Sequence, residues 1–476
     1  MRRSISFLVL VGVAALGCNA LLGLGDFHDC TDAVCDASDG GDGGDGSDAT
    51  PEAGACSTDD AGASVGCSPS APVCSHGACA SVKSLAHGGL ATHSCAVLSD
   101  GHVRCWGTNY AKQLGAAATD GAFPVEVPGI ADVAEVAVGN GFTCARTTSG
   151  DVSCWGTDLE GELGDDGVAG NSTATPSKVT LPQPAIAISS GDGTCAALSD
   201  GSVWCWGENG FGELGCPSGS SHLDEPIPYT TPFQLTPDTG FAVAALAVGS
   251  YTACFSSAYG GANDDALCYG DPRNGLADDV VVYQQYCWVT QNGGVQFQDD
   301  DGGGFLAGAF DVLSSGDGFT CGIQNLAGVP RASCWGENDF GQVDGVDEAL
   351  DAGFFAIAAP AAAKLDNLGI HGITHISAGR QHACSVAIVG NDGGTAVQCW
   401  GRGTEQEGTG EPFALEVAGL TDVIDLAAHT NFTCALQKSG VVACWGEGAF
   451  QAGPTSYQLL ANGSADDQGT PTPVRW

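Results

Sequence analysis

The apolar positions of this chain fall in short runs that end at glycine. Four of these runs read VKSLAHG at 82–88, VAEVAVG at 133–139, VAALAVG at 243–249 and ITHISAG at 373–379. β-Branched runs bounded by Gly, Asn and Asp are typical of short strands. No long stretch has apolar residues at helical spacing, and charged residues make up only 15% of the chain. The pattern predicts an all-β protein.

A second pattern pairs two cysteines across a polar turn. Residues 93–107 read HSCAVLSDGHVRCWG, with Ser-Asp-Gly at the turn and Trp-Gly after the second cysteine. The seven first cysteines of such hairpins are about 50 to 67 residues apart, a repeat period typical of a propeller, a solenoid or an array. The further copies are at 142–156, 193–207, 252–270, 319–336, 382–401 and 432–446.

The piece that follows each hairpin begins at or near proline. Examples are PVEV at 124–127, PSKV at 176–179 and PFALEV at 412–417, and the chain ends in PVRW at 473–476. Proline lacks an N–H, so it suits an edge strand. Seven units of four short strands predict a seven-bladed β-propeller with four-stranded blades over residues 81–476.

The register of the first hairpin follows from its turn. If Ser99, Asp100 and Gly101 form a three-residue loop, Gly101 takes the position that needs a positive φ, and Cys95 faces Cys105. A redox role would need an exposed thiol of low pKa, usually in Cys-x-x-Cys, which no hairpin has. We therefore predict structural disulfides, which pair Cys95–Cys105, Cys144–Cys154, Cys195–Cys205, Cys254–Cys268, Cys321–Cys334, Cys384–Cys399 and Cys434–Cys444.

An aromatic residue follows the second cysteine of every hairpin. Exposed rings in every blade could bind carbohydrate, whereas buried rings would fill the space between blades and the following glycine would let backbones approach. We favour packing between blades. The residues are Trp106, Trp155, Trp206, Tyr269, Trp335, Trp400 and Trp445.

These motifs resemble the regulator of chromosome condensation repeat, in a cysteine-bearing form found in exported bacterial lipoproteins. The best copy is CAALSDGSVWCWGENGFGELG at 195–215, and CAVLSDGHVRCWGTNYAKQLG at 95–115 is close. The resemblance implies a seven-bladed propeller. Family members include a nucleotide-exchange factor for a nuclear GTPase that binds chromatin and a secreted inhibitor of β-lactamases, so it also implies a rigid disc that binds proteins. The copies depart from the pattern at Tyr269, at 341–345 and at 401–408, and His429 replaces the usual glycine.

The N-terminus is predicted to be a signal peptide over residues 1–17. Arg2 and Arg3 precede a short apolar core that ends in ALGC, which resembles a bacterial lipoprotein signal. We expect Cys18 to carry a lipid that anchors the exported protein in the outer membrane or at the cell surface. An ordinary signal peptide with a nearby cysteine is the alternative.

Two small segments lie between the anchor and the repeats. Residues 18–55 are rich in Gly, Asp and Ala, and we expect a flexible acidic tether. GGDGSD at 43–48 matches one turn of a calcium-binding repeat, but further copies at a period of nine residues are missing. Residues 56–80 should form a small disulfide-rich module, with zinc as the rival because His76 lies among the cysteines. Its cysteines are Cys56, Cys67, Cys74 and Cys79, whose pairing the sequence leaves open.

The remaining cysteines are also expected to form disulfides. An exported chain with 23 cysteines, of which Cys18 is set aside for the lipid, has an even number to pair. Cys30 and Cys35 lie in the tether, and Cys216 and Cys287 lie in long connections of adjacent units. We predict a Cys216–Cys287 disulfide that would hold an aromatic binding surface. Its residues are Tyr283, Tyr286 and Trp288, for which packing onto the disc is the alternative.

Charge and motifs narrow the function. The net charge of −42 disfavours nucleic acid as a partner. No catalytic constellation, metal site or cofactor fingerprint is evident, and His371 and His375 flank a strand-like run, where their spacing does not build a metal site. We expect a monomeric, non-catalytic scaffold that binds a protein or glycan. A polysaccharide hydrolase or lyase, and a structural protein of the envelope or spore coat, are the alternatives.

Overall fold

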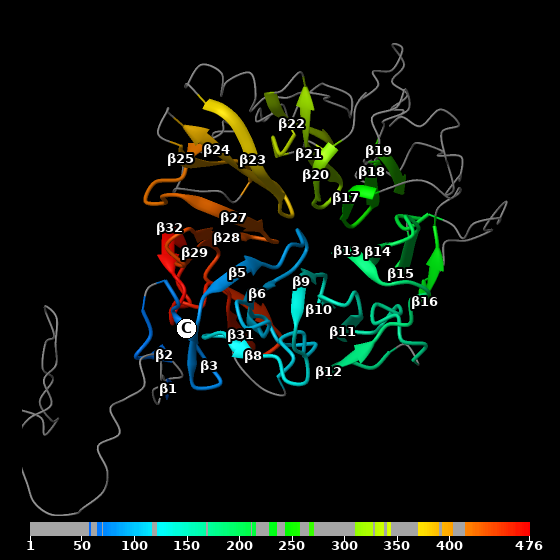
Figure 1. The fold of residues 1–476 in the computed structure, drawn as a ribbon, viewed down its shortest axis with the longest axis horizontal. Helices are drawn as coiled ribbons and strands as arrows, with labels where there is room; N and C mark the ends of the chain where they lie inside the picture. The colour runs from blue at the N-terminus through cyan, green and yellow to red at the C-terminus, as the bar shows by residue number, and fades with distance from the viewer. Residues whose placement is uncertain are drawn as a thin grey trace, which may run out of the picture. The chain divides into compact units, whose positions relative to one another are not determined.

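The computed structural model divides the chain into two compact units, Met1–Pro51 and Glu52–Trp476. The residues that it describes all belong to the second unit, and their regular elements are β-strands (Figure 1). None of them forms a helix long and apolar enough to cross a membrane. The described residues are 57–58, 64–68, 70–116, 121–167, 170–210, 212–215, 228–235, 243–257, 266–270, 310–326, 329–337, 340–343, 370–389, 393–402 and 415–476.

The cysteine hairpins lie in antiparallel sheets that are arranged as the blades of a propeller (Figure 1). Within the described residues five of these sheets have four strands, and two, which contain the hairpins at 252–270 and 319–336, have three. The predicted all-β propeller with four-stranded blades is therefore confirmed. The innermost strands are β5 (Val82–Leu85), β9 (Val133–Val138), β13 (Ala185–Ser190), β17 (Val243–Val248), β20 (Phe310–Ser315), β23 (Ile370–Ala378) and β27 (Val423–Ala428).

The other strands of each blade follow outward in chain order. The second strands are β6 (His93–Leu98), β10 (Phe142–Thr147), β14 (Gly193–Leu198), β18 (Thr252–Ser257), β21 (Phe319–Leu326), β24 (His382–Val389) and β28 (Phe432–Gln437). The third strands are β7 (Val103–Gly107), β11 (Val152–Gly156), β15 (Val203–Gly207), β19 (Ala266–Gly270), β22 (Val329–Gly336), β25 (Gly394–Gly401) and β29 (Val442–Gly446). The edge strands are β8 (Val125–Glu126), β12 (Thr173–Lys178), β16 (Tyr229–Gln234), β26 (Leu415–Glu416) and β32 (Gln468–Pro473).

Backbone hydrogen bonds join neighbouring blades near the axis. Each runs from an amide beside the end of one innermost strand to a carbonyl of the adjacent blade, and the series returns to the first blade. The bonds are Val138 N–His87 O, Asn140 N–Gly191 O, Asp192 N–Gly249 O, Ser250 N–Gly316 O, Asp317 N–Arg380 O, Arg380 N–His429 O and Thr430 N–Ala91 O.

The first hairpin has the register that its turn predicts. Cys95 pairs with Cys105, the N–H of Leu98 donates to the carbonyl of His102, and Gly101 has a φ of 82°. The Cα atoms of the two cysteines are 4.0 Å apart, as in a non-hydrogen-bonded pair. The other six hairpins also contain a disulfide between directly opposed cysteines. Disulfide bonds are thus confirmed as a structural feature of the repeats.

The tryptophans that follow the second cysteines are buried between blades. Trp155 lies in a core cluster with Val97 and Val103 of the preceding blade, and its Nε1 donates to the carbonyl of Gln113 at 2.9 Å. Trp206 and Trp400 make the same bond to the preceding blade. Side-chain exposure is at most 4% in all six tryptophans of this set. These rings are therefore packing elements rather than exposed carbohydrate platforms.

The small cysteine-rich module packs against the first blade. It contains β1 (Ser57–Thr58), β2 (Ser64–Val65), β3 (Val73–Ser75) and β4 (Ala78–Ala80), and a Cys67–Cys79 disulfide. Val73 and Ala80 share a core cluster with Trp106, and Arg104 donates to the carbonyl of Cys74 at 2.6 Å. The module is therefore fixed to the blade rather than suspended from it.

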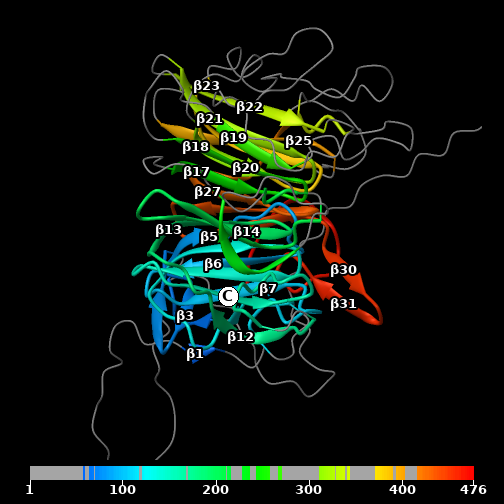
Figure 2. The same cartoon turned by 90° about the vertical axis from the view of Figure 1, so that its right-hand side faces the viewer.

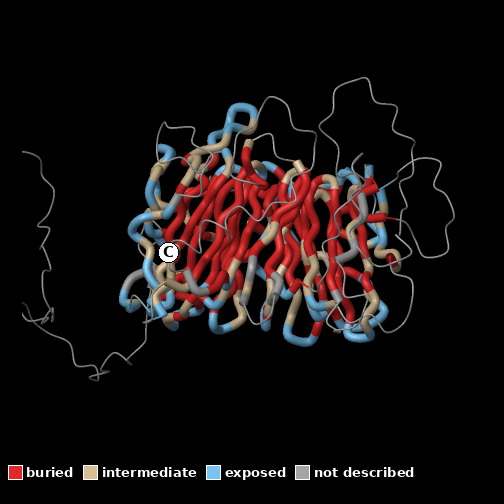
Figure 3. Tube along the Cα trace, turned by 90° about the horizontal axis from the view of Figure 1, so that it is seen from above, coloured by how far each residue is buried: buried red, intermediate tan, exposed pale blue. Residues whose placement is uncertain are grey.

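The propeller has two different faces. The first-to-second-strand loops and the third-to-fourth-strand connections lie on one side, which we call the loop face. The second-to-third-strand turns lie on the other side, the hairpin face. Figure 2 shows β30 (Ala449–Ala452) and β31 (Thr455–Gln458) projecting on the loop face and β3 toward the opposite side. Figure 3 shows buried strands between these two exposed edges.

Candidate binding surfaces: the central channel and the loop face

The innermost strands surround a central cavity of about 230 Å³. One part of its wall is polar and carries His87, Glu135, His375 and Asp425. The remaining part of the wall carries no charged side chain. Its strands contribute aliphatic residues such as Ile188, Leu246 and Val312, together with serines. The cavity therefore has a charged side and an uncharged side.

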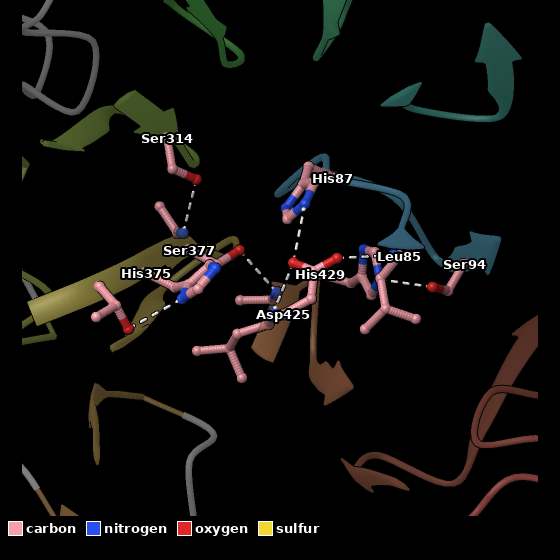
Figure 4. A network of polar contacts seen from close by, with 12 residues as sticks. Leu85, His87, Ser94, Ser314, His375, Ser377, Asp425 and His429 are labelled. Atoms are coloured by element: carbon pink, nitrogen blue, oxygen red, sulfur yellow. Dashed lines mark hydrogen bonds and ion pairs between the residues drawn. The ribbon is translucent and has the colours of Figure 1, made fainter. Parts of the chain in front are cut away.

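Asp425 is the most highly connected group of the polar wall (Figure 4). Its Oδ2 accepts from the N–H of Leu85 at 2.8 Å, its Oδ1 accepts from the N–H of Leu426 at 2.8 Å, and Nε2 of His87 lies 3.3 Å from Oδ1. Burial raises the pKa of Asp425, but His87 and the Leu85 N–H outweigh burial and bring this pKa below its ordinary value. The carboxylate joins the last blade to the first, so its oxygens are occupied by the protein.

His87 is the partner of Asp425 in this pair. Burial within the channel lowers the pKa of His87, but the Asp425 carboxylate outweighs it, so the net pKa is raised. The side chain is still 53% exposed, because the ring faces the open channel. On β23, in the blade before that of Asp425, burial lowers the pKa of His375. His87 therefore holds its proton more tightly than His375.

Other polar side chains near the channel serve as links between blades. The hydroxyls of Ser314 and Ser377 accept from the N–H groups of Ala378 and Ala428, at 2.9 and 2.8 Å (Figure 4). Nε2 of the buried His429 lies 2.9 Å from the hydroxyl of Ser94. The geometry assigns these groups to the frame of the propeller.

The loop face carries carboxylates that lie close to one another. Burial, with the neighbouring Glu208 and Asp317 adding to it, raises the pKa of Asp192 to about 7. Burial also raises the pKa of Glu208, and Glu160 and Glu162 contribute in the same direction. Asp192 accepts a hydrogen bond from Asn140 Nδ2 at 3.1 Å. The negative charge of this region is therefore only partly compensated by the protein.

Three cations of the described loop face have partners of their own. Lys112 Nζ donates to the carbonyl of Ser172 at 2.7 Å, and Arg380 Nε donates to Asp317 at 2.9 Å. The guanidinium of Arg402 lies 4.8 Å from the ring centroid of Phe340. None of these three contacts neutralises Asp192 or Glu208.

Two large apolar side chains are exposed beside these carboxylates. Leu159 is 62% exposed and Tyr110 is 48% exposed. The centroid of Tyr110 lies 6.4 Å from that of Phe450, and a Cβ added at Gly141 of the next blade would lie 3.1 Å from its hydroxyl. Tyr110 therefore bridges the last blade and the second blade across the surface.

Several predicted site residues lie outside the described residues. They include the lipidation site Cys18, the cysteines Cys30, Cys35, Cys56, Cys216 and Cys287, and the aromatic set Tyr283, Tyr286 and Trp288. Sequence reasoning missed the Asp425–His87 pair and the exposed Tyr110 and Leu159. The available signal for the pair was a charged residue within an otherwise apolar innermost strand. Within the described part of the chain no group of three or more His, Cys, Asp or Glu residues could hold a metal ion.

Comparison with family models decides the nature of the repeats. Residues 91–113, 133–162 and 185–213 match one model of the Regulator of chromosome condensation (RCC1) repeat, and residues 200–255 match a second model of this repeat. The chain carries RCC1 repeats. No curated protein matches the chain in sequence.

Solved structures share the fold of this chain. Yeast RCC1 (Prp20), solved bound to Kap60, is 20% identical with a TM-score of 0.57 over 79% of this chain and 84% of that chain. A Saccharomyces cerevisiae Prp20p structure, described with its binding properties to Gsp1p and histones, has the same identity and TM-score and covers 79% and 86%. Human WBSCR16 is 16% identical with a TM-score of 0.58 over 79% and 94%. At these identities the likeness establishes the fold alone.

Proposed function

We propose that the protein is an exported, lipid-anchored and non-catalytic binding protein whose propeller holds a partner on its loop face. In this proposal Cys18 carries the lipid, residues 18–55 form the tether, residues 56–80 form the docked module, and residues 81–476 close into seven four-stranded blades. The single observation that carries the binding role is the exposed Tyr110–Leu159 surface beside incompletely paired carboxylates.

The position of the module supports this choice of face. The imidazole centroids of His76 and His102 are 4.2 Å apart, and His102 follows the turn of the first hairpin. The module thus contacts the hairpin-face end of the first blade. A partner on the loop face would approach from the side opposite this contact.

The solved RCC1 structures suggest which kind of partner to expect, namely another protein. The yeast protein was solved with Kap60 bound, and Prp20p is described with Gsp1p and histones. We transfer only the mode, a rigid propeller that binds another protein. A chain of net charge −42 is unsuited to binding DNA directly.

The central channel offers little support for an enzyme, whereas the loop face supports a binding role. A glycosidase needs two carboxyl groups that are free to act on the substrate. Asp425 is engaged by Leu85, Leu426 and His87, and Glu135 accepts from Arg146 Nε at 2.8 Å. Both groups therefore have structural partners already.

A capture experiment with matched surface variants tests the proposal. The wild-type chain, Leu159→Glu on the loop face and Ile186→Glu on the hairpin face would be immobilised and exposed to native envelope extract. Ile186 is 49% exposed, so both substitutions place a charge at a similarly open apolar position. We expect a protein or glycan that the wild type and Ile186→Glu retain and Leu159→Glu loses. Equal retention by all three would contradict the loop face as the binding surface.

A further inference from the structure

The loop face carries both exposed apolar side chains and carboxylates that interact with one another. Leu159 is followed directly by Glu160, and Glu160 is close enough to Glu208 to raise the pKa of that carboxyl. Glu208 in turn acts on Asp192, and both belong to the blade that follows the blade of Glu160. A Cβ added at Gly207, the residue before Glu208, would lie 3.4 Å from Cα of Glu162, so the acidic segments of these two blades lie close together on the loop face.

The acidic border extends past the third blade. Asp192 and Asp317 both act on Tyr251, whose pKa is raised first by burial and then by these carboxylates and Glu337. Arg380 pairs with Asp317, so the charge at that end is partly balanced. Glu160, Glu208 and Asp192 lie at the other end of this series of carboxylates, and Glu160 directly follows the exposed Leu159 in the chain.

We propose that this surface docks a cationic segment of a partner protein, in which an apolar side chain contacts Tyr110 and Leu159 while Lys or Arg side chains approach Glu160, Asp192 and Glu208. The inference rests on the proposed function and adds the chemistry of the partner. Its basis is charge complementarity: the described loop-face cations Lys112, Arg380 and Arg402 contact other groups, and the exposed aromatic and aliphatic side chains are suitable anchors.

Electrostatic theory gives the expected behaviour of such a contact. Basic groups brought to crowded carboxylates would lower the carboxyl pKa values and favour the charged forms. Attraction between partly exposed charges weakens as the Debye length shortens with added salt. Binding should therefore tighten between pH 6 and 8, as Asp192 ionises, and weaken with ionic strength.

Three synthetic peptides test the inference directly. In the first, lysines alternate with leucine and tryptophan; in the second, glutamates replace the lysines; in the third, serines replace the leucine and tryptophan. We expect the full-length protein to bind the first peptide at least about tenfold more tightly than either of the others. Equal binding of the first and third peptides would show attraction to net charge alone and would overturn the inference.

Matched charge variants separate this surface from the net charge of −42. At pH 8, Asp192→Asn with Glu208→Gln removes two charges from the loop face, and Asp132→Asn with Asp200→Asn removes two from the hairpin face. We expect the loop-face pair to weaken binding of the first peptide about tenfold and the hairpin-face pair to change it less than twofold. An equal loss in both pairs would overturn the inference.

A native partner distinguishes this inference from the proposed function. A partner that requires Leu159 but contacts the loop face through a neutral or acidic surface would leave the proposed function standing and would refute the cationic chemistry. A partner that is insensitive to Leu159→Glu would refute the loop-face function itself. Leu159 is mostly exposed, so its substitution should leave folding intact, and a thermal unfolding curve checks this.

Discussion

The same residue type behaves in opposite ways on the two faces of this propeller. On the hairpin face Asp200 accepts from the N–H and the hydroxyl of Ser202, at 3.0 and 2.6 Å, and these bonds lower its pKa. On the loop face burial and neighbouring carboxylates raise the pKa of Asp192 to about 7. The hairpin-face carboxylate stabilises its own turn. The charged form of the loop-face carboxylate is instead destabilised by its surroundings.

Backbone geometry also differs between the faces: it is uniform on the hairpin face and variable on the loop face. Four hairpin turns repeat one conformation with a glycine at positive φ, at Gly101, Gly150, Gly201 and Gly440. The described loop-face connections vary in length and sequence, and in the last blade they include the β30–β31 hairpin. The hairpin face therefore repeats one turn structure from blade to blade, whereas the loop face differs between blades.

The largest predicted effect concerns buried histidines at the loop-face ends of the blade interfaces. His93 and His382 contact Thr143 and Thr433 of the next blades, at 2.7 and 2.9 Å. Burial lowers their pKa values to about 3 and about 4. An unfolded histidine binds a proton below about pH 6.5 and these do not, so stability is retained above that pH and falls as the pH drops toward 4.

Replacement by phenylalanine should remove this acid sensitivity. Phe142 and Phe319 occupy the same repeat position in other blades, which makes His93→Phe with His382→Phe compatible with the fold. At pH 4.5 each substitution should raise the free energy of unfolding by about 2.5 kcal/mol relative to its effect at pH 7. Urea unfolding at both pH values measures this. Equal losses on acidification in the variant and the wild type would contradict the assignment.

The next largest predicted effect is the loss of stability when a glycine on the hairpin face, rather than one on the loop face, is replaced by alanine. Gly101 on the hairpin face has a φ of 82°, and a Cβ there would lie 2.9 Å from the backbone of Asp132. Gly101→Ala should lower the free energy of unfolding by about 1 to 3 kcal/mol. Gly210 on the loop face has room for a Cβ, with Glu208 Oε1 at 3.7 Å, so Gly210→Ala should stay within about 0.5 kcal/mol. Thermal unfolding measures the stability of both variants. A larger loss of stability in Gly210→Ala than in Gly101→Ala would contradict the prediction.

Neutralising one carboxylate on each face should change stability in opposite directions. Asp192 has a raised pKa, so its ionisation lowers stability progressively as the pH rises from about 4 to 7, and Asp192→Asn should raise the unfolding free energy at pH 8 by at least about 1.4 kcal/mol. Asp200 has a lowered pKa and contributes stability above its ordinary pKa, so Asp200→Asn should be slightly destabilising at pH 8. Changes of the same sign would remove the distinction between the faces.

The smallest predicted effect on stability is at Leu159. Its side chain is 62% exposed, and Leu159→Ser should change the unfolding free energy by less than about 0.5 kcal/mol. The same change should disrupt partner binding. Parallel unfolding and binding measurements therefore separate a surface role from a structural one, and a large loss of stability would assign Leu159 to the core.

The sequence predicted those structural features whose residues recur in each repeat. The Cys95–Cys105 register and the positive φ of Gly101 follow from a turn motif that uses local rules, and Trp155 is recognisable as packing because every blade has its equivalent. The Asp425–Leu85 contact was not predictable, since 340 residues separate the partners and only closure of the ring brings them together. The exposure of Leu159 likewise depends on neighbouring blades rather than on its own motif.

Hydrogen exchange of the native complex tests the central claim most directly. With the captured partner bound, amides of the loop-face segments 109–115 and 157–164 should exchange more slowly, while those of the hairpin turns 98–102 and 198–202 should be unchanged. This pattern would establish the loop face as the binding surface. Protection of the hairpin turns without protection of the loop-face segments would contradict the account.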